Sequence, residues 1–329
     1  MAPTGTSALQ RDYETLRERC GLLDRSERGK LALTGAGAVE FLNGQVTNEL
    51  TTLGPGEGCY AAFLTHKGKM LGDLRILAVG GGTEESGAVT ELLLDTERSA
   101  LQSLFDMIRR FKVGFEVELG KRTLECGLLS LIGPDAARVA GADGLGEAEH
   151  SHRRVALEGV DARAVRTDVG VDLICDADRT GALTEALLAH GAEPVGEDAA
   201  ECLRVERGRP RYGVDLDDSV IPQEAGLNER AVSFTKGCYV GQETVARLHW
   251  RGKPNRHLRG LRLSAPVEPG AELRLGERVV GHLTSAVLSP THGPIGLALV
   301  RREAEPGSTV SVNGDGLGGE VIELPFPAR

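Results

Sequence analysis

Aromatic residues are scarce in this sequence. Phe, Tyr and Trp make up 4% of its 329 residues, and there is a single Trp. The buried core must therefore consist mainly of Leu, Val, Ile and Ala. No apolar run reaches the roughly 18 residues that a membrane-spanning helix needs. Residues 1–10 also lack the charged and apolar regions of a signal peptide. We therefore expect a cytoplasmic protein with no membrane association.

The sequence has few cysteines, and its acidic residues outnumber its basic residues. The six cysteines are dispersed and none form a C-x-x-C pair, so we expect no metal site and a reducing compartment. The net charge is −10 and the pI is about 5.4. An acidic chain repels a phosphate backbone, so general nucleic-acid binding is disfavoured. A local patch of basic residues could still bind nucleic acid despite the negative net charge.

A weak internal repeat organises most of the chain. Residues 31–38 are similar to residues 129–136, and both read as a strand, a Gly and the start of a helix. The surrounding order of strands and helices fits a ferredoxin-like unit, present twice. Within the first copy, strands at 59–64 and 71–79 flank a K-G-K turn and predict a β-hairpin. Chance similarity of two strand–Gly–helix segments is the alternative.

The residue pattern of the sequence changes near residue 254. From there on the chain consists of short β-runs separated by turn residues, which indicates a small barrel or sandwich. We therefore expect an α+β fold: a first α/β module at 1–120, a second at 121–253 and a C-terminal β-barrel at 254–329. We expect a monomer.

Cys238 stands in the segment K-G-C-Y-V-G-Q-E at 236–243. Its flanking glycines allow a sharp turn and close approach to a ligand. Lys236, two residues before the thiol, favours the thiolate. Residues 240–248 show a helical pattern, which would place Cys238 near a helix N-terminus and favour an anion there. A buried, inert Cys at a loop-to-helix joint is the alternative.

This octapeptide resembles the signature of the YgfZ family. Five further segments resemble other parts of the same proteins and extend the match over most of the chain. They are F-L-N-G-Q-V-T-N (41–48), T-H-K-G-K-M (65–70), R-V-E-R-G followed by Tyr212-Gly213 (204–213), I-P-Q-E (221–224) and R-H-L-R-G (256–260).

The resemblance implies three modules arranged in a ring, with tetrahydrofolate or a one-carbon derivative in a central channel. It also implies a role in assembling or repairing iron–sulfur clusters in client proteins, with Cys238 required. The family is related to the aminomethyltransferase, or T-protein, of the glycine cleavage system, so folate-dependent aminomethyl transfer is the alternative function. The transferases have Asp-Phe where this chain has Cys238-Tyr239, which favours the accessory role.

Two carboxylates are candidates for the site. By its match to the R-x-E-x-G segment, Glu206 is expected to hold the pterin, whose amino group and ring N–H a carboxylate can accept together. A surface Glu in a charged run is the alternative. The transferases carry an acid on the strand after the K-G-K turn, and by that resemblance Asp73 is expected to lie near the reactive folate nitrogens and to relay a proton or stabilise a cation. Pairing of Asp73 with Arg75 is the alternative.

The remaining candidates are an aromatic residue and three cations. Tyr212 is expected to stack on the ligand or to hydrogen-bond it, with core packing as the alternative. Lys236, Arg247 and Arg251 are candidates for the negative glutamate tail of folate, with solvated surface charge as the alternative.

Overall fold

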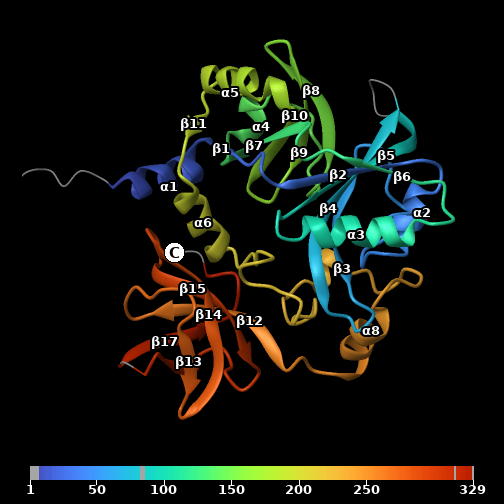
Figure 1. Ribbon diagram of the computed structural model, residues 1–329. Coiled ribbons are helices and arrows are strands. Elements are labelled where there is room, and N and C mark those ends of the chain that lie inside the picture. The colour runs from blue at the N-terminus through green and yellow to red at the C-terminus, as the bar shows by residue number, and fades with distance from the viewer. Residues whose placement is uncertain (1–6, 82–85, 315, 328–329) are drawn as a thin grey trace, which may run out of the picture.

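The computed structural model describes residues 7–81, 86–314 and 316–327, and Figure 1 labels the elements. The helices are Ala8–Glu18 (α1), Ala38–Asn43 (α2), Leu101–Phe111 (α3), Ala136–Val139 (α4), Thr180–Ala189 (α5), Glu197–Glu206 (α6), Asn228–Ala231 (α7) and Gln242–Arg251 (α8), with a 3-10 turn at Ala177–Arg179. The strands are Gly21–Asp24 (β1), Gly29–Thr34 (β2), Gly58–Leu64 (β3), Met70–Gly81 (β4), Ser86–Thr96 (β5), Glu118–Lys121 (β6), Cys126–Ile132 (β7), His152–Leu157 (β8), Val160–Arg166 (β9), Gly170–Asp176 (β10), Glu193–Pro194 (β11), Arg256–Leu263 (β12), Glu272–Leu275 (β13), Arg278–Ser289 (β14), Gly293–Arg301 (β15), Thr309–Val312 (β16) and Leu317–Ile322 (β17).

The first sheet has the strand order β3-β4-β5-β2-β6. Side chains alternate between the two faces of a strand, so Leu74 and Ile76 of β4 point to one face and pack with Leu42 of α2 and Leu104 of α3. The other face carries Leu77 and the residues in phase with it. The expected hairpin is present, because β3 pairs antiparallel with β4.

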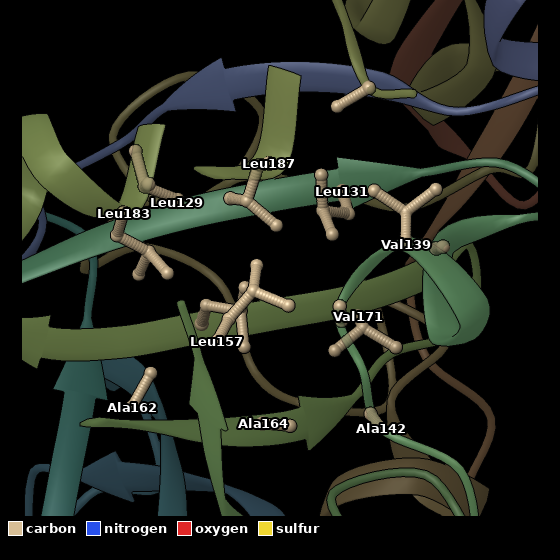
Figure 2. Packing of buried hydrophobic residues seen from close by; sticks show 14 of the residues in the cluster. Leu129, Leu131, Val139, Ala142, Leu157, Ala162, Ala164, Val171, Leu183 and Leu187 are labelled. Atoms are coloured by element: carbon tan, nitrogen blue, oxygen red, sulfur yellow. The ribbon is translucent and has the colours of Figure 1, made fainter. Parts of the chain in front are cut away.

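The second sheet has the order β11-β1-β7-β10-β9-β8. Figure 2 shows Leu183 and Leu187 of α5 facing Leu129 and Leu131 of β7. The expected first module at 1–120 is divided between the two sheets, because β1 hydrogen-bonds to β7 and β11 of the second sheet. The N-terminal segment therefore belongs with the second module, and its short apolar strand gave no sign of its distant partner.

The internal repeat corresponds to equivalent positions in the two modules. Gly35 follows β2 with a φ of 105°, and Gly133 follows β7 with a φ of 129°. A Cβ on Gly35 would lie 2.2 Å from the backbone oxygen of Glu116, and one on Gly133 would lie 2.4 Å from that of Arg19. Both turns therefore require glycine for its backbone freedom and for its lack of a side chain.

The C-terminal strands close into a barrel, β12-β15-β14-β13-β16-β17. Its interior is apolar, with Leu261, Leu273 and Val312 fully buried. In Figure 1 α6 lies between the second sheet and this barrel, and it contacts both α1 and β14. Two α/β modules and a closed barrel are present, so the fold class expected from the sequence is confirmed. In the part of the chain that the structure describes, no helix combines the length and the apolar character that a bilayer crossing needs.

Candidate active site

The two sheets meet face to face, and their interface changes from apolar to polar along the strands. Leu77, Val79 and Leu93 of the first sheet pack with Leu128 and Ile174 of the second. Further along the same faces, side chains two and four residues away carry charge or a hydroxyl. These polar positions are Asp73, Arg75, Asp95, Ser130 and Asp172. Because side chains alternate along each strand, these polar residues lie on the same faces as the apolar ones and form a polar end of the interface between the sheets.

A buried ion-pair network joins the two sheets at this polar end. Arg75 on β4 pairs with Asp95 on β5 at 2.8 Å and with Asp172 on β10 at 2.7 Å. Asp95 also accepts from Arg28 Nε at 2.9 Å, and Asp172 accepts from Ser130 Oγ at 2.7 Å. Burial alone would raise the pKa of Asp95, but Arg28 and Arg75 outweigh it and hold the pKa below its usual value. The network fixes the position of the first module against the second.

Asp95 and Thr96 end a strand and do not cap the helix that follows. Both residues lie in β5, and α3 begins only at Leu101 with Ala100 at its N-cap. Asp95 belongs to the ion-pair network, while Thr96 Oγ1 donates a 2.5 Å hydrogen bond to the backbone oxygen of Asp73. The strand simply continues two residues beyond its apolar run.

Asp73 is the titratable group at the centre of this region. Its side chain is buried, with 6% exposed, and this burial raises the pKa of Asp73 to about 6 although the Tyr60 hydroxyl donates a hydrogen bond to it. Tyr60 reaches Asp73 because β3 and β4 pair with Ala62 opposite Asp73 and Tyr60 opposite Arg75. A carboxyl group with this pKa can hold or release a proton near neutral pH.

Two adjoining cavities meet at Asp73. The inner cavity has a volume of about 230 Å³ and lies between the two sheets, where Arg75, His150 and Arg230 line it. The outer cavity has a volume of about 420 Å³ and extends towards Tyr212. Arg25, Arg28, Tyr60 and Asp73 line both cavities.

A larger cavity of about 1000 Å³ lies elsewhere, between the barrel and the segment 213–219. Exposed arginines of the barrel, including Arg301 and Arg302, line it, and none of the residues predicted from the sequence does. We place the candidate site at Asp73 because that region combines burial, a carboxyl group with a raised pKa and a joint between modules. Within the described residues, no group of three or more His, Cys, Asp or Glu is arranged to hold a metal ion.

Glu206 lines neither of the two cavities at Asp73, and the pterin-binding role expected for it remains a prediction. Its carboxylate accepts hydrogen bonds from the Tyr13 hydroxyl at 2.9 Å and from Ser289 Oγ at 2.5 Å. Tyr13 belongs to α1 and Ser289 ends β14, so Glu206 ties the N-terminal helix to the barrel. Both carboxylate oxygens accept hydrogen bonds from the protein, and a carboxylate has further acceptor sites beyond these.

Lys236 is also engaged within the protein. Its Nζ donates to the backbone oxygens of Asn43, Val46 and Asn48 at 2.6, 2.9 and 2.6 Å. Burial lowers the pKa of Lys236 to about 8. An ammonium group has three donors, and all three bind these backbone oxygens in the structure. Lys236 thus holds the segment 236–243 against the segment 41–48.

The other predicted residues divide between the site and the surface. Tyr212 is half-buried and lines the outer cavity together with Asp73. Cys238, Arg247 and Arg251 are exposed on or near α8 and line neither cavity. The structure thus brings together Asp73 and Tyr212 and separates them from the other candidates.

Sequence reasoning missed several residues that line the cavities. Tyr60, Arg28, His150 and Arg230 carry no motif that marks them as functional. Tyr60 could have been found from the hairpin, because it lies on a strand that pairs with the strand of Asp73. Arg28 and His150 come from loops and Arg230 from the short helix α7, and their approach to Asp73 depends on how the two modules dock.

Comparison with known proteins connects this architecture to one family. The model of the GCVT N-terminal domain matches residues 3–236, and that of the glycine cleavage T-protein C-terminal barrel domain matches residues 256–326. The chain is 30% identical over 320 residues to a chloroplastic protein of Arabidopsis thaliana that is named as a transferase, covering 94% of this chain and 71% of that protein. It is 31% identical over 353 residues to an aminomethyltransferase of Geobacillus kaustophilus, covering 99% and 92%.

A solved structure extends the match to three dimensions. The glycine cleavage system aminomethyltransferase T of Bartonella henselae superposes with a TM-score of 0.84 at 26% sequence identity, covering 97% of this chain and 89% of that one. Both family models, with their boundary between residues 236 and 256, agree with the separate barrel that begins at β12. The chain belongs to the glycine cleavage T-protein family, with its N-terminal domain and its C-terminal barrel both present.

Proposed function

We propose that this protein binds tetrahydrofolate in the adjoining cavities around Asp73 and transfers a one-carbon unit, as an aminomethyltransferase of the T-protein type. The observation that carries the proposal is the buried carboxyl group of Asp73, with its pKa raised to about 6 and with Tyr60 hydrogen-bonded to it. Membership of the T-protein family supports the same reaction class.

The residues around Asp73 fit a reduced folate. Cavities of about 230 and 420 Å³ that share four lining residues suit the flat ring and its extension, since ligand sites commonly measure about 300–1,000 Å³. The aromatic rings of Tyr60 and Tyr212 both line the outer cavity and offer surfaces against which a heterocycle can pack. Glu206 is not needed for this fit.

The protein's own groups supply positioning and proton transfer. When bound, tetrahydrofolate would supply the amine nitrogens that accept a one-carbon unit. Asp73 can take a proton from, or return one to, a nitrogen close to its carboxylate. The Tyr60 hydroxyl orients that carboxylate, and the burial of Asp73, which is 6% exposed, strengthens these interactions.

The experiment measures binding and transfer separately. Wild type should bind tetrahydrofolate in anaerobic calorimetry and form methylene-tetrahydrofolate from a carrier protein with a lipoyl-bound aminomethyl group. Asp73→Asn should reduce kcat by about 10²–10⁴-fold, the range for loss of a general acid–base, while exposed Asp217→Asn serves as the matched control. Absence of tetrahydrofolate binding by wild type would exclude the proposal.

Cys238 favours a second candidate, an iron–sulfur accessory role of the YgfZ type that also uses folate. The observation behind it is exposure: Cys238 is exposed, whereas the other five cysteines are buried or half-buried. If this role applies, a deletion strain complemented with Cys238→Ala should bind folate normally yet fail to restore the activity of cluster-containing enzymes. Full restoration by Cys238→Ala would reject the accessory role, and absence of product with an active donor would reject the transferase.

A further inference from the structure

The cavity of about 1000 Å³ beside the barrel is separate from the candidate site at Asp73. It shares no lining residue with either of the cavities there. Its volume lies in the range of ligand sites, which commonly measure about 300–1,000 Å³. The segment 213–219 forms part of its wall, and residues of the barrel strands β12, β14 and β15 form another part. The proposed function makes no use of this cavity.

The barrel side of this cavity is basic, although the chain as a whole is acidic. Residues 244–267 contain six Lys or Arg residues and no Asp or Glu, whereas the whole chain has 48 acidic and 38 basic residues. This stretch places Arg256, at the start of β12, in the cavity wall. The cations that line the cavity are Lys69, Arg256, Arg278, Arg301 and Arg302.

Two of these arginines lie opposite each other on neighbouring strands. β12 and β15 pair antiparallel with Arg256 opposite Arg301. Residues in this relation have Cβ atoms about 4.5–5.5 Å apart, and like charges there are destabilising. The fold therefore keeps two positive charges together in the wall of a cavity, and a bound anion would offset their repulsion.

Ion pairs take up three of the four carboxylates found among the described lining residues. The pairs are Glu224 with Arg256 at 3.0 Å, Glu303 with Arg278 at 2.9 Å and Asp215 with Arg204 at 2.6 Å. Outside these pairs the lining holds one carboxylate, Asp217, and three cations, Lys69, Arg301 and Arg302. Arg301 and Arg302 form no ion pair within 4.0 Å among the described residues. Positive charge is therefore in excess at the cavity.

The three cations offer donors from two sides of the cavity. Lys69 Nζ donates to the backbone oxygen of Ser219 at 2.5 Å, which leaves two of its three N–H donors. Arg301 and Arg302 each carry a planar guanidinium fork, which matches the oxygens of a phosphate group. Lys69 follows the hairpin turn of the first module, whereas the two arginines belong to the barrel. A ligand with two or more phosphate groups fits this arrangement better than a single ion.

A neighbouring cavity of about 540 Å³ continues the basic surface. It shares Arg302 and Glu303 with the larger cavity and adds Lys253. The described residues that line the two cavities include no Phe, Tyr or Trp. Proteins that bind single-stranded nucleic acid stack its bases on aromatic side chains, so the lining favours a small phosphorylated molecule.

We propose that the cavity between the barrel and the segment 213–219 binds a small molecule that carries two or more phosphate groups, with Arg301, Arg302 and Lys69 as its main contacts. This site is separate from the cavities at Asp73, and the inference does not depend on the proposed function.

Isothermal titration calorimetry with sodium tripolyphosphate tests the inference, in a low-salt buffer without phosphate or divalent cations. Wild type should bind tripolyphosphate at least about tenfold more tightly than orthophosphate, because the longer anion reaches cations on both sides of the cavity. The double variant Arg301→Gln with Arg302→Gln should weaken binding at least about tenfold, since it removes two charged donors. The matched control is Arg109→Gln with Arg110→Gln, which removes an exposed arginine pair on α3 and should leave the affinity unchanged.

Thermal melts separate a binding role from a structural one. Arg301→Gln should keep or raise the Tm, because it removes the like charge opposite Arg256. Tripolyphosphate should raise the Tm of wild type more than that of the variant. A clearly lower Tm for Arg301→Gln without ligand would give Arg301 a structural role and would overturn its assignment to the site.

Three results of the calorimetry would overturn the inference. They are absence of tripolyphosphate binding by wild type, an unchanged affinity in the folded Arg301 and Arg302 double variant, and an equal loss in the control. Citrate that binds as tightly as tripolyphosphate would overturn the assignment to phosphate groups. Tetrahydrofolate binding is measured separately, so each of these failures leaves the proposed function standing.

Discussion

The raised pKa of Asp73 makes a quantitative prediction about the stability of the protein. Burial moves the pKa from an ordinary value of 3.8 to about 6 in the folded state. Because the folded-state pKa is the higher one, the stabilising contribution is complete below pH 3.8 and is lost as the pH rises through 6. A difference of about two pKa units corresponds to ~3 kcal/mol, of which ~2 kcal/mol falls between pH 4.5 and 7.5.

Asp73→Asn removes this titration while keeping the shape of the side chain and an oxygen that can accept from Tyr60. We therefore expect the free energy of unfolding of Asp73→Asn, relative to wild type, to rise by ~2 kcal/mol from pH 4.5 to 7.5. Urea denaturation followed by far-UV circular dichroism at matched pH values measures this difference. Comparison at each pH cancels the contributions of all other titrating groups.

The control variant, Asp217→Asn, is expected to change in stability with pH in the opposite direction. Hydrogen bonds from Ser219 outweigh desolvation and lower the pKa of exposed Asp217, so its stabilising contribution is present above its unfolded pKa and is lost on acidification. The stability of Asp217→Asn relative to wild type should therefore fall slightly as the pH rises, with solvent screening keeping the change small. A pH-independent difference between Asp73→Asn and wild type would refute the reasoning.

Three further predictions concern other parts of the molecule. Asp172→Ala should cost about 1–3 kcal/mol in urea denaturation, because Arg75 loses one of its two carboxylate partners and Ser130 loses its acceptor, while Asp95 still pairs with Arg75; an unchanged free energy of unfolding would contradict the network. Cys238→Ala should leave the Tm and tetrahydrofolate affinity unchanged but abolish the fast-reacting thiol in a native Ellman's titration, since burial raises the pKa of Cys59 to about 12; persistence of the fast phase would refute this. Gly35→Ala should destabilise the protein by about 1–3 kcal/mol in thermal melts, because the new Cβ meets a backbone oxygen and the positive φ strains it; an unchanged Tm would exclude the steric account.

Local sequence patterns predicted the parts of the fold that depend on neighbours in the chain. The hairpin of β3 and β4 follows from strand alternation around a K-G-K turn, and the equivalent turns at Gly35 and Gly133 follow from the repeated segment. Asp73 was found from the resemblance of its strand, and of the turn before it, to the corresponding segment of the transferases. These features are fixed by residues only a few positions apart.

Long-range contacts determine the surroundings of Glu206 and Lys236, which sequence reasoning could not anticipate. Glu206 lies 193 residues from Tyr13 and 83 from Ser289, and nothing near Glu206 in the chain reveals either partner. Lys236 reaches backbone oxygens nearly 190 residues earlier. The motif showed that these positions matter, but only the docking of the modules shows that the protein itself takes up their hydrogen bonds.

The position of β1 has a consequence for the order in which the chain folds. This strand lies between β7 and β11. Both partner strands are synthesised more than a hundred residues after β1. The first sheet can form from residues 29–121 during synthesis. The backbone of β1 remains unpaired until its partner strands have been synthesised. Non-local pairing of this kind slows folding and leaves strand edges open to misassembly. A shortened N-terminus would therefore harm the last stage of folding, by exposing the edge of β7, more than it would harm the site at Asp73.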